Sequence, residues 1–166
     1  MNIGSSWGYK SWEKNWKSAE TIIRNLNTIA ARGGNYLLNV GPDARGCIPQ
    51  ESVQILLELA RWMQKNGDSI YGCGYADRPK PENGRITRNG NKLYYHIYEA
   101  AIGDIPLEGL RREEVEKVRL LATGAEVKIS DSWMAANYPD TGFVNLGPSP
   151  LLPDPVDTVL EVTLKA

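Results

Sequence analysis

Apolar residues recur at three- and four-residue spacing along residues 18–32, and this pattern predicts an amphipathic helix. The apolar face consists of Ala19, Ile22, Ile23, Leu26, Ile29 and Ala30. Ser18 carries the short hydroxyl side chain that caps helix N-termini, and Gly33 and Gly34 accept the left-handed backbone common at helix C-termini. We therefore expect one helix that its own sequence closes at both ends.

A shorter run, from Tyr36 to Val40, shows no regular alternation of apolar and polar residues. Runs of this kind are typical of strands covered on both faces, as in parallel sheets. The run leads into a Gly41-Pro42-Asp43 loop. We predict a brief buried strand that ends in a stiff polar loop.

A second helical pattern begins near Pro49 and continues to about Lys65, where Asn66-Gly67 ends it. Its apolar stripe consists of Val53, Leu56, Leu57, Ala60 and Met63. Helix, buried strand, loop and helix follow one another as in an α/β unit. One strand cannot form a parallel sheet, so these elements need partners that residues 1–70 do not supply.

The pattern changes after Tyr75. The segment "ADRPKPENGRITRNGN" is polar and rich in turn-forming residues, which predicts a linker or an exposed loop over residues 76–91. Five strand-like runs follow, namely "KLYYHIYEA", "EKVRLLAT", "AEVKIS", "GFVNLG" and "TVLEVTLKA". Short strands separated by turn signals predict an antiparallel sandwich or barrel, here over residues 76–166.

In the first of these runs, one set of side chains alternates with a set of three aromatic residues, Tyr94, His96 and Tyr98. This second face either packs against a neighbouring layer or presents an aromatic platform for a sugar. The chain has a single histidine, His96, which we interpret as a sheet residue rather than a catalyst.

Composition narrows the function classes. The chain is 42% hydrophobic and 23% charged, with a formal net charge of −1. No global field draws in nucleic acid or an anionic membrane, and no apolar run approaches the roughly 20 residues of a membrane span. The N-terminus lacks the pattern of a secretory signal. We expect neither nucleic acid nor membrane as a partner.

Two cysteines, Cys47 and Cys73, are too few for a disulfide framework and match no zinc spacing, so we expect unpaired, semi-buried thiols. No metal, nucleotide or redox cofactor is expected, because no ligand cluster or phosphate-binding glycine loop appears. Aromatic residues crowd the first segment, at Trp7, Tyr9, Trp12 and Trp16. They either pack a small core or present faces that stack on sugar rings.

Three segments resemble the C-terminal part of the α-L-fucosidases of glycoside hydrolase family twenty-nine. They are "SWGY" at Ser6–Tyr9, "RGGNYLLNVGPDARGCIP" at residues 32–49 and "WMQKNGDSIYG" at residues 62–72. Tyr36 replaces the family's usual Leu, and Asp68-Ser69 replaces Glu-Ala.

The resemblance implies an α+β, multidomain fold. Residues 1–75 would be the C-terminal part of a (β/α)8-like catalytic barrel, with two helices and one buried strand. Residues 76–166 would be the C-terminal antiparallel β-sandwich. The run from Tyr36 to Val40 would then be a final barrel strand, and Asn39 would lie at its C-terminal end, where barrel enzymes build their active sites.

The implied activity is retaining hydrolysis of terminal α-L-fucosides, from fucosylated glycans or small fucosides, without a cofactor. Retention requires two carboxyl groups about 5–5.5 Å apart. The family's nucleophile lies in a Trp-Phe-Asp-Gly-type sequence that is absent here, and its acid/base Glu lies upstream of Ser-Trp-Gly-Tyr. We therefore expect a truncated piece that lacks both groups and is inactive alone.

The remaining candidate catalytic residues are Glu13 and Asp43. Glu13 is alternatively a solvated residue before the first helix, and Asp43 alternatively organises a turn through local backbone N–H groups. By resemblance, Trp7 and Tyr9 border the sugar pocket and are candidate substrate-binding residues, although both also suit packing under the loop. Asn39 completes this set, either orienting a neighbouring group or capping the strand.

Two alternative functions stay open. A short fucosidase would be active only as an oligomer, because copies of the chain would cover each other's apolar faces and strand edges. A non-catalytic carbohydrate-binding module would use the sandwich alone. The expected protein partner is thus a second copy or the missing barrel portion. Cellular location stays open, since family members are often secreted, periplasmic or lysosomal.

Overall fold

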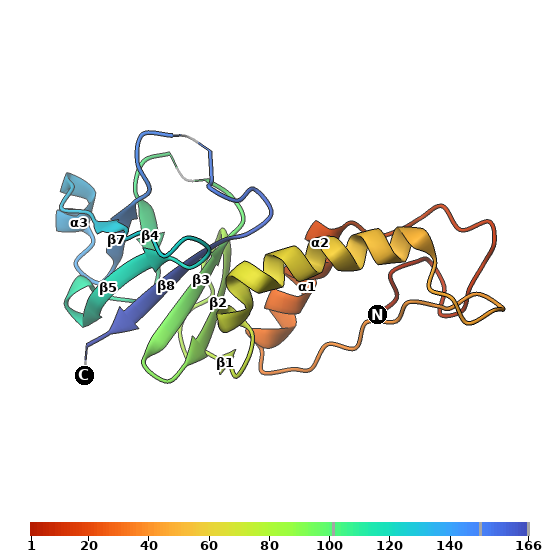
Figure 1. Cartoon of the computed structure of the whole chain (residues 1–166). Coiled ribbons are helices and arrows are strands. Elements are labelled where there is room, and N and C mark those ends of the chain that lie inside the picture. The colour runs from red at the N-terminus through yellow and green to blue at the C-terminus, as the bar shows by residue number, and fades with distance from the viewer. Residues whose placement is uncertain (101, 150, 166) are drawn as a thin grey trace.

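The computed structural model describes residues 1–100, 102–149 and 151–165, so Ala166, the last residue of the predicted sandwich, lies outside the described residues. The molecule is elongated, with the strands at one end, two helices in the middle and long loops at the other end (Figure 1). The fold is mixed α+β with antiparallel sheets, and the described residues close no barrel. No described helix has the length and apolar character to cross a membrane.

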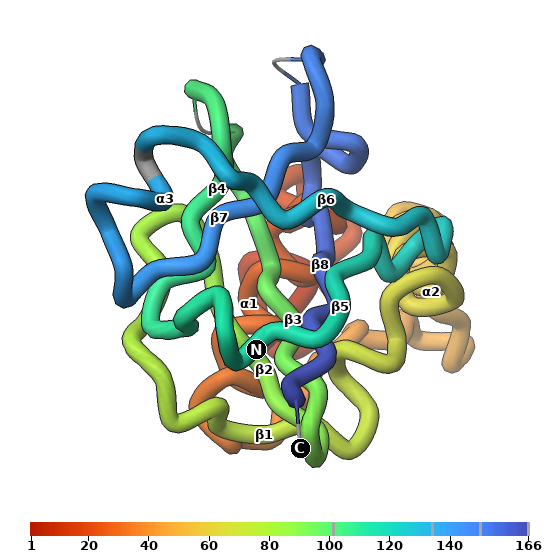
Figure 2. Tube along the Cα trace, turned by 90° about the vertical axis from the view of Figure 1, so that its left-hand side faces the viewer, coloured from red at the N-terminus to blue at the C-terminus, as the bar shows by residue number. Residues whose placement is uncertain are grey.

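Two antiparallel sheets face each other at the strand end of the molecule (Figure 2). The first contains, in spatial order, β1 (Gly74–Tyr75), β2 (Gly84–Asn89), β3 (Lys92–Ile97), β8 (Thr158–Leu164) and β5 (Val115–Leu120). The second contains β4 (Ile105–Leu107), β7 (Gly142–Asn145) and β6 (Lys128–Ile129). Five of these strands coincide with the five runs predicted from the sequence, although β5 begins one residue before its run. Apolar side chains of both sheets form the main core, among them Leu93, Tyr95, Leu107, Val144 and Leu160.

Two long helices cover the other face of the five-stranded sheet. They are α1 (Ala19–Ala30) and α2 (Gln50–Asn66), and the short α3 (Trp133–Asn137) lies in a loop between β6 and β7. The predicted N-cap is confirmed, because Ser18 Oγ accepts a hydrogen bond from the backbone N–H of Thr21 at 3.1 Å. The predicted stop is confirmed as well, since Gly33 adopts a φ of 70° just beyond the helix.

Strand β3 is buried on both faces. Successive side chains of a strand point to opposite sides, so Leu93 and Tyr95 enter the core between the sheets, while Tyr94 meets Ile23 and Trp62 of the two helices. The ring of Tyr98 lies under the guanidinium of Arg24, 4.8 Å from its carbon. The interpretation of the Tyr94, His96 and Tyr98 face as an open sugar platform is therefore wrong, because the helices cover it.

The predicted buried strand at residues 36–40 is also wrong in its burial. The segment is extended, but its one β-bridge is a parallel contact of Asn39 with Asn2, and Leu37 is 73% exposed. Three hydrogen bonds join it to residues 1–3: Met1 N to Leu37 O, Asn39 N to Met1 O and Ile3 N to Asn39 O, at 2.8, 2.8 and 3.0 Å. Among the described residues no strand covers its other edge, so it stays on the surface.

The predicted linker at residues 76–91 contains a strand. Strand β2 occupies its second half and pairs with the whole of β3 through a tight turn at Gly90. Ile86 is the one apolar residue of this strand, and a single apolar residue among turn formers does not predict a strand. The strand forms because its backbone pairs with β3, which the local sequence does not indicate.

The face that helix α2 buries overlaps only in part with the predicted stripe, of which Met63 packs against the cluster that contains Trp62. Its buried residues are Ser52, Trp62 and Asn66, whereas Leu57 of the predicted stripe is 45% exposed. Helical periodicity was correct, but it does not say which neighbour a face meets. The apolar stripe of α2 is therefore partly exposed to solvent. In the first loop of the chain, Trp12 is also exposed, at 73%.

Candidate functional site

Two loops meet at the end of the molecule that is far from the sandwich. The first follows residue 3 and carries Trp7 and Tyr9; the second follows the extended segment at residues 37–39. Asn39 Nδ2 donates a hydrogen bond to the backbone oxygen of Trp7 at 2.6 Å. Gly41 has a φ of 54°, and a Cβ there would lie 3.4 Å from backbone atoms of residues 7–9. The left-handed backbone favours glycine here, whereas a contact of 3.4 Å is an ordinary van der Waals distance.

Glu13 organises the first loop rather than standing free in solvent. Its carboxylate accepts hydrogen bonds from the Ser5 hydroxyl, from the Ser5 backbone N–H at 2.8 Å, and from the backbone N–H groups of Lys14 and Asn15 at 3.0 and 2.9 Å. The Ser5 hydroxyl, followed by these N–H groups, lowers the pKa of Glu13 from 4.5 to about 2. The structure thus gives Glu13 a role in holding the loop that faces Asn39.

We expect acid to release this loop at an unusually low pH. The hydrogen bonds need the ionised carboxylate, so they stabilise the loop above the ordinary pKa of 4.5 and are lost as the pH falls through about 2. In an NMR titration, the amide signal of Ser5 should shift with a midpoint near that value. Glu13→Gln should abolish the titration, and a midpoint near 4.5 would contradict the assignment.

Asp43 closes the second loop. Its Oδ1 accepts hydrogen bonds from the backbone N–H groups of Arg45 and Cys47, both at 2.9 Å, and Oδ2 pairs with the Arg45 guanidinium at 3.1 Å. The Cys47 N–H and then the Arg45 groups lower the pKa of Asp43. The interpretation of Asp43 as a turn organiser agrees with this geometry.

Neither carboxylate has the environment of a glycosidase acid. A general acid needs a raised pKa, which burial or a second carboxylate supplies. The pKa values of Glu13 and Asp43 are both lowered, and N–H donors already occupy their oxygens. The two residues therefore suit loop structure better than proton transfer.

The aromatic residues of the first loop face solvent. Trp7 is 64% and Tyr9 47% exposed, so they do not form the small core that was one sequence interpretation. The hollow beside them, lined by residues that include Tyr9, Trp16 and Asn39, has a volume of only about 10 Å³. A sugar ring does not fit into this space. The loops thus form an open wall rather than a closed pocket.

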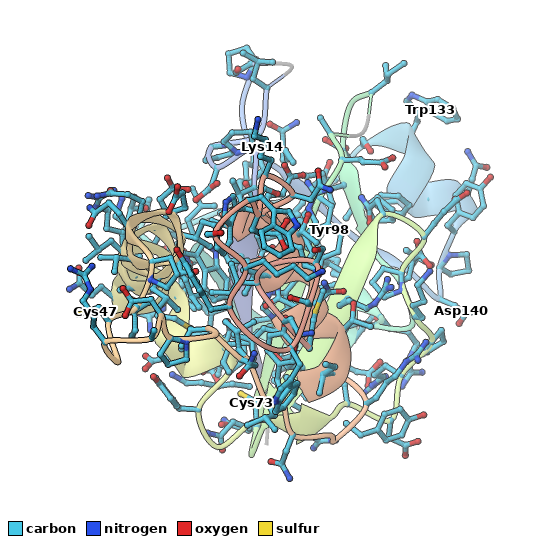
Figure 3. All side chains as sticks on the ribbon, turned by 90° about the vertical axis from the view of Figure 1, so that its right-hand side faces the viewer. Lys14, Cys47, Cys73, Tyr98, Trp133 and Asp140 are labelled. Atoms are coloured by element: carbon cyan, nitrogen blue, oxygen red, sulfur yellow. The ribbon has the colours of Figure 1, made fainter. Side chains whose placement is uncertain are left out.

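The thiols of Cys47 and Cys73 are both free and lie apart from each other (Figure 3). Cys73 is half-buried as expected, whereas the expectation is wrong for Cys47, which is exposed. Among the residues that the structure describes, no three His, Cys, Asp or Glu side chains gather as metal ligands.

Sequence reasoning missed two contributors to the site. Ser5 binds the carboxylate of Glu13, eight residues away, and no spacing pattern signals this contact. Lys17 Nζ donates to the carbonyl oxygen of Gly4 at 3.1 Å and ties the loop to the start of α1. Both contacts depend on the path of the loop, which only the structure provides.

The structure and sequence are similar to those of known enzymes. A family model described as Alpha-L-fucosidase matches residues 1–68. An alpha-L-fucosidase of Dictyostelium discoideum is 47% identical over 72 residues, which is 42% of this chain and 16% of that protein. A tissue alpha-L-fucosidase of Rattus norvegicus is 29% identical over 136 residues, or 74% of this chain and 28% of that protein.

Two solved structures extend the likeness to the whole fold. Alpha-L-fucosidase isoenzyme 1 from Paenibacillus thiaminolyticus has 48% identity and a TM-score of 0.95, over 100% of this chain and 39% of that one. The Thermotoga maritima alpha-fucosidase in complex with fucose has 30% identity and a TM-score of 0.80, over 98% of this chain and 39% of that one.

These matches relate the chain to the glycoside hydrolases. Within that class they support the alpha-L-fucosidase family, and the chain is fucosidase-related. It spans 16% and 28% of the two curated relatives and 39% of each solved structure.

Proposed function

We propose that the chain is the C-terminal portion of a retaining α-L-fucosidase, with residues 1–75 in its (β/α)8-like barrel and residues 76–166 as its β-sandwich. One observation carries this proposal. Residues 1–3 and 37–39 pair in parallel, and α1 connects them. Strand, helix and parallel strand form the βαβ unit, and α2 follows as the next helix of such a barrel.

In this arrangement, the candidate substrate residues occupy the end where barrel enzymes bind their ligands. Trp7 and Tyr9 follow the first extended segment, and Asn39 lies at the end of the second. We infer that Trp7 and Tyr9 cover the apolar side of a terminal fucose. Asn39 acts on the same wall, because its hydrogen bond to the Trp7 carbonyl fixes the aromatic loop.

The two catalytic carboxylates then come from polypeptide other than residues 1–166. The lowered pKa values of Glu13 and Asp43 do not suit the acid of a retaining pair, and local hydrogen bonds on their oxygens hold both carboxylates in loop structure rather than free as a nucleophile. The substrate class is a fucosylated glycan or a small α-L-fucoside, whose glycosidic bond those external groups would cleave.

The partner is the remaining part of the barrel. Leu37, Ile48 and Leu57 are 73%, 42% and 45% exposed on the helix and loop half, and such side chains favour burial against another surface. A homo-oligomer is the second candidate, because the same exposed side chains drive self-association. Size-exclusion chromatography distinguishes the two, since only a homo-oligomer assembles from the chain alone.

Complementation tests the proposed function. The pure chain should not cleave an aryl α-L-fucoside. Mixed or co-expressed with the part of the Paenibacillus enzyme that it does not cover, it should restore turnover. Turnover by the chain alone would contradict the assignment of the carboxylates to other polypeptide.

Trp7→Ala should lower kcat/KM of the restored enzyme at least roughly tenfold, as expected for losing an apolar contact with substrate. Trp133→Ala is the matched control, because Trp133 is 75% exposed on α3, in the sandwich. Its kcat/KM should not change. Equal activity of the two variants would remove Trp7 from the substrate wall.

A further inference from the structure

A separate cavity lies where the helices meet the sandwich. It has a volume of about 390 Å³, and its walls come from the end of α1, from β1, from the segment after β1 and from β2. This volume is within the usual range of small-molecule sites, about 300–1,000 Å³. It is also far larger than the hollow of about 10 Å³ beside Tyr9.

Four cationic side chains line this cavity, Arg32, Arg78, Lys80 and Arg85, and no lining residue is acidic. Arg78 is neutralised by Glu114, 2.9 Å away. The ion pairs found among the described residues leave the other three cations without a carboxylate partner. The cavity therefore carries an excess of positive charge in a chain whose net charge is −1.

Arg85 is held in place while its charge stays unneutralised. Its Nε donates to Thr28 Oγ1 at 3.1 Å and its Nη1 to the Gly84 carbonyl oxygen at 2.6 Å. A fixed guanidinium loses little freedom when it binds an oxyanion, and it presents paired N–H groups to sulfate or carboxylate. Lys80 adds a flexible point charge to the same cavity.

Tyr75 gives the cavity an apolar surface beside its charges. It lines the cavity and is 64% exposed, so its ring face is open to a ligand. Asp77, between two lining residues, has a φ of 50°, a left-handed conformation that aspartate tolerates better than most residues. Asp77 is thus the acidic residue next in sequence to the residues that line the cavity.

We propose that this cavity binds the acidic group of a saccharide, a sulfate ester or a carboxylate, with the sugar ring against Tyr75. Arg85 and Arg32 hold the oxyanion, and Lys80 adds to the attraction. This site is separate from the proposed fucose-binding residues Trp7, Tyr9 and Asn39, so it does not depend on fucoside hydrolysis.

Isothermal titration calorimetry of the whole chain at low ionic strength tests this proposal. Galactose 6-sulfate or glucuronate should bind, and uncharged galactose should bind about tenfold more weakly or not at all. Inorganic sulfate should bind more weakly than galactose 6-sulfate, because it makes no contact with Tyr75. Equal affinity for inorganic sulfate would overturn the sugar contact, and binding of neither acidic sugar would overturn the site.

Two variants with the same change in charge locate the binding. Arg32→Ala/Lys80→Ala should weaken galactose 6-sulfate binding about tenfold, whereas Arg61→Ala/Lys65→Ala on α2 should leave it unchanged. An equal loss of binding affinity in both double variants would show that only the net charge matters and would overturn the site.

Asp77→Asn, which keeps a residue suited to the left-handed backbone, should tighten binding about twofold. Unchanged or weaker binding would place Asp77 outside the field of the cavity and contradict the proposed charge arrangement.

Discussion

Gly84→Ala is expected to break the pairing of β2 with β3 and to lower the free energy of unfolding by about 3 kcal/mol or more. A Cβ at Gly84 would overlap the backbone carbonyl oxygen of His96 and lie 2.9 Å from its carbonyl carbon. Backbone atoms cannot rotate away as a flexible side chain can. The strands must separate, although they lie side by side along six registered pairs. Urea unfolding followed by circular dichroism measures the loss.

Gly74→Ala is the matched control for this variant. Gly74 lies in β1 of the same sheet, and a Cβ there would meet no atom within 4 Å. Both substitutions remove the same backbone freedom from the unfolded chain, so their difference reports the contact in the folded state. The control should stay within about 0.5 kcal/mol of the parent protein. Equal stability of the two variants would show that β2 has room to move.

Sequence patterns predicted the helices well because their signals are local. Helix α1 is defined by local signals, namely the cap at Ser18, the apolar face and the stop at Gly33. In the structure Ser18 caps the helix, Gly33 has a positive φ, and four residues of the apolar face are buried: Ala19, Ile22, Ile23 and Ala30. The strand runs of the sandwich were predicted for a similar reason. Each carries enough β-branched and aromatic residues to indicate a strand wherever it pairs.

Features that depend on a partner were not predictable. The Tyr36–Val40 run has the composition of a covered strand, yet the described residues supply a neighbour on one edge alone, at residues 1–3. Strand β2 has a weak local pattern, and β3 decides its conformation. The stripe of α2 shows correct periodicity without indicating that Ser52 and Trp62 would be the buried side.

The same distinction applies to the sites. The turn at Asp43 was predictable because its partners lie two and four residues away. The cavity lined by Arg32 and Arg85 was not, since more than 50 residues separate these two cations along the chain. Charge clusters that form across elements leave no spacing signal in the sequence.

The single histidine lies in a contact that joins the helices to the sandwich. His96 Nδ1 is 2.8 Å from Asp157 Oδ2, and Asn27 of α1 donates to the same oxygen at 2.7 Å. Both members of the His96–Asp157 pair are fully buried. The prediction that His96 is a sheet residue is confirmed, and its partners explain why an ionisable ring lies inside the protein.

Each ring nitrogen of His96 has a polar neighbour. The Thr87 hydroxyl donates to the Ser69 carbonyl oxygen at 2.6 Å, so it offers a lone pair to His96 Nε2 at 3.3 Å. Nε2 therefore faces an acceptor, and Nδ1 lies against Asp157 Oδ2, which also accepts from Asn27. Both ring nitrogens of His96 thus have a polar partner inside the protein.

His96→Ala is accordingly expected to lower the free energy of unfolding by about 3 kcal/mol, because it empties the space that the ring fills and leaves the carboxyl group of Asp157 buried without its ring partner. Urea unfolding measures the loss, and Glu116→Ala, at an exposed position on β5, should change stability by less than about 0.5 kcal/mol. Removing both partners in His96→Ala/Asp157→Ala should cost less than the sum of the single variants, since the second substitution eliminates the buried polar group that lost its partner. Strict additivity would mean that the ring and the carboxyl group act independently, and the coupling inferred from their contact would then be wrong.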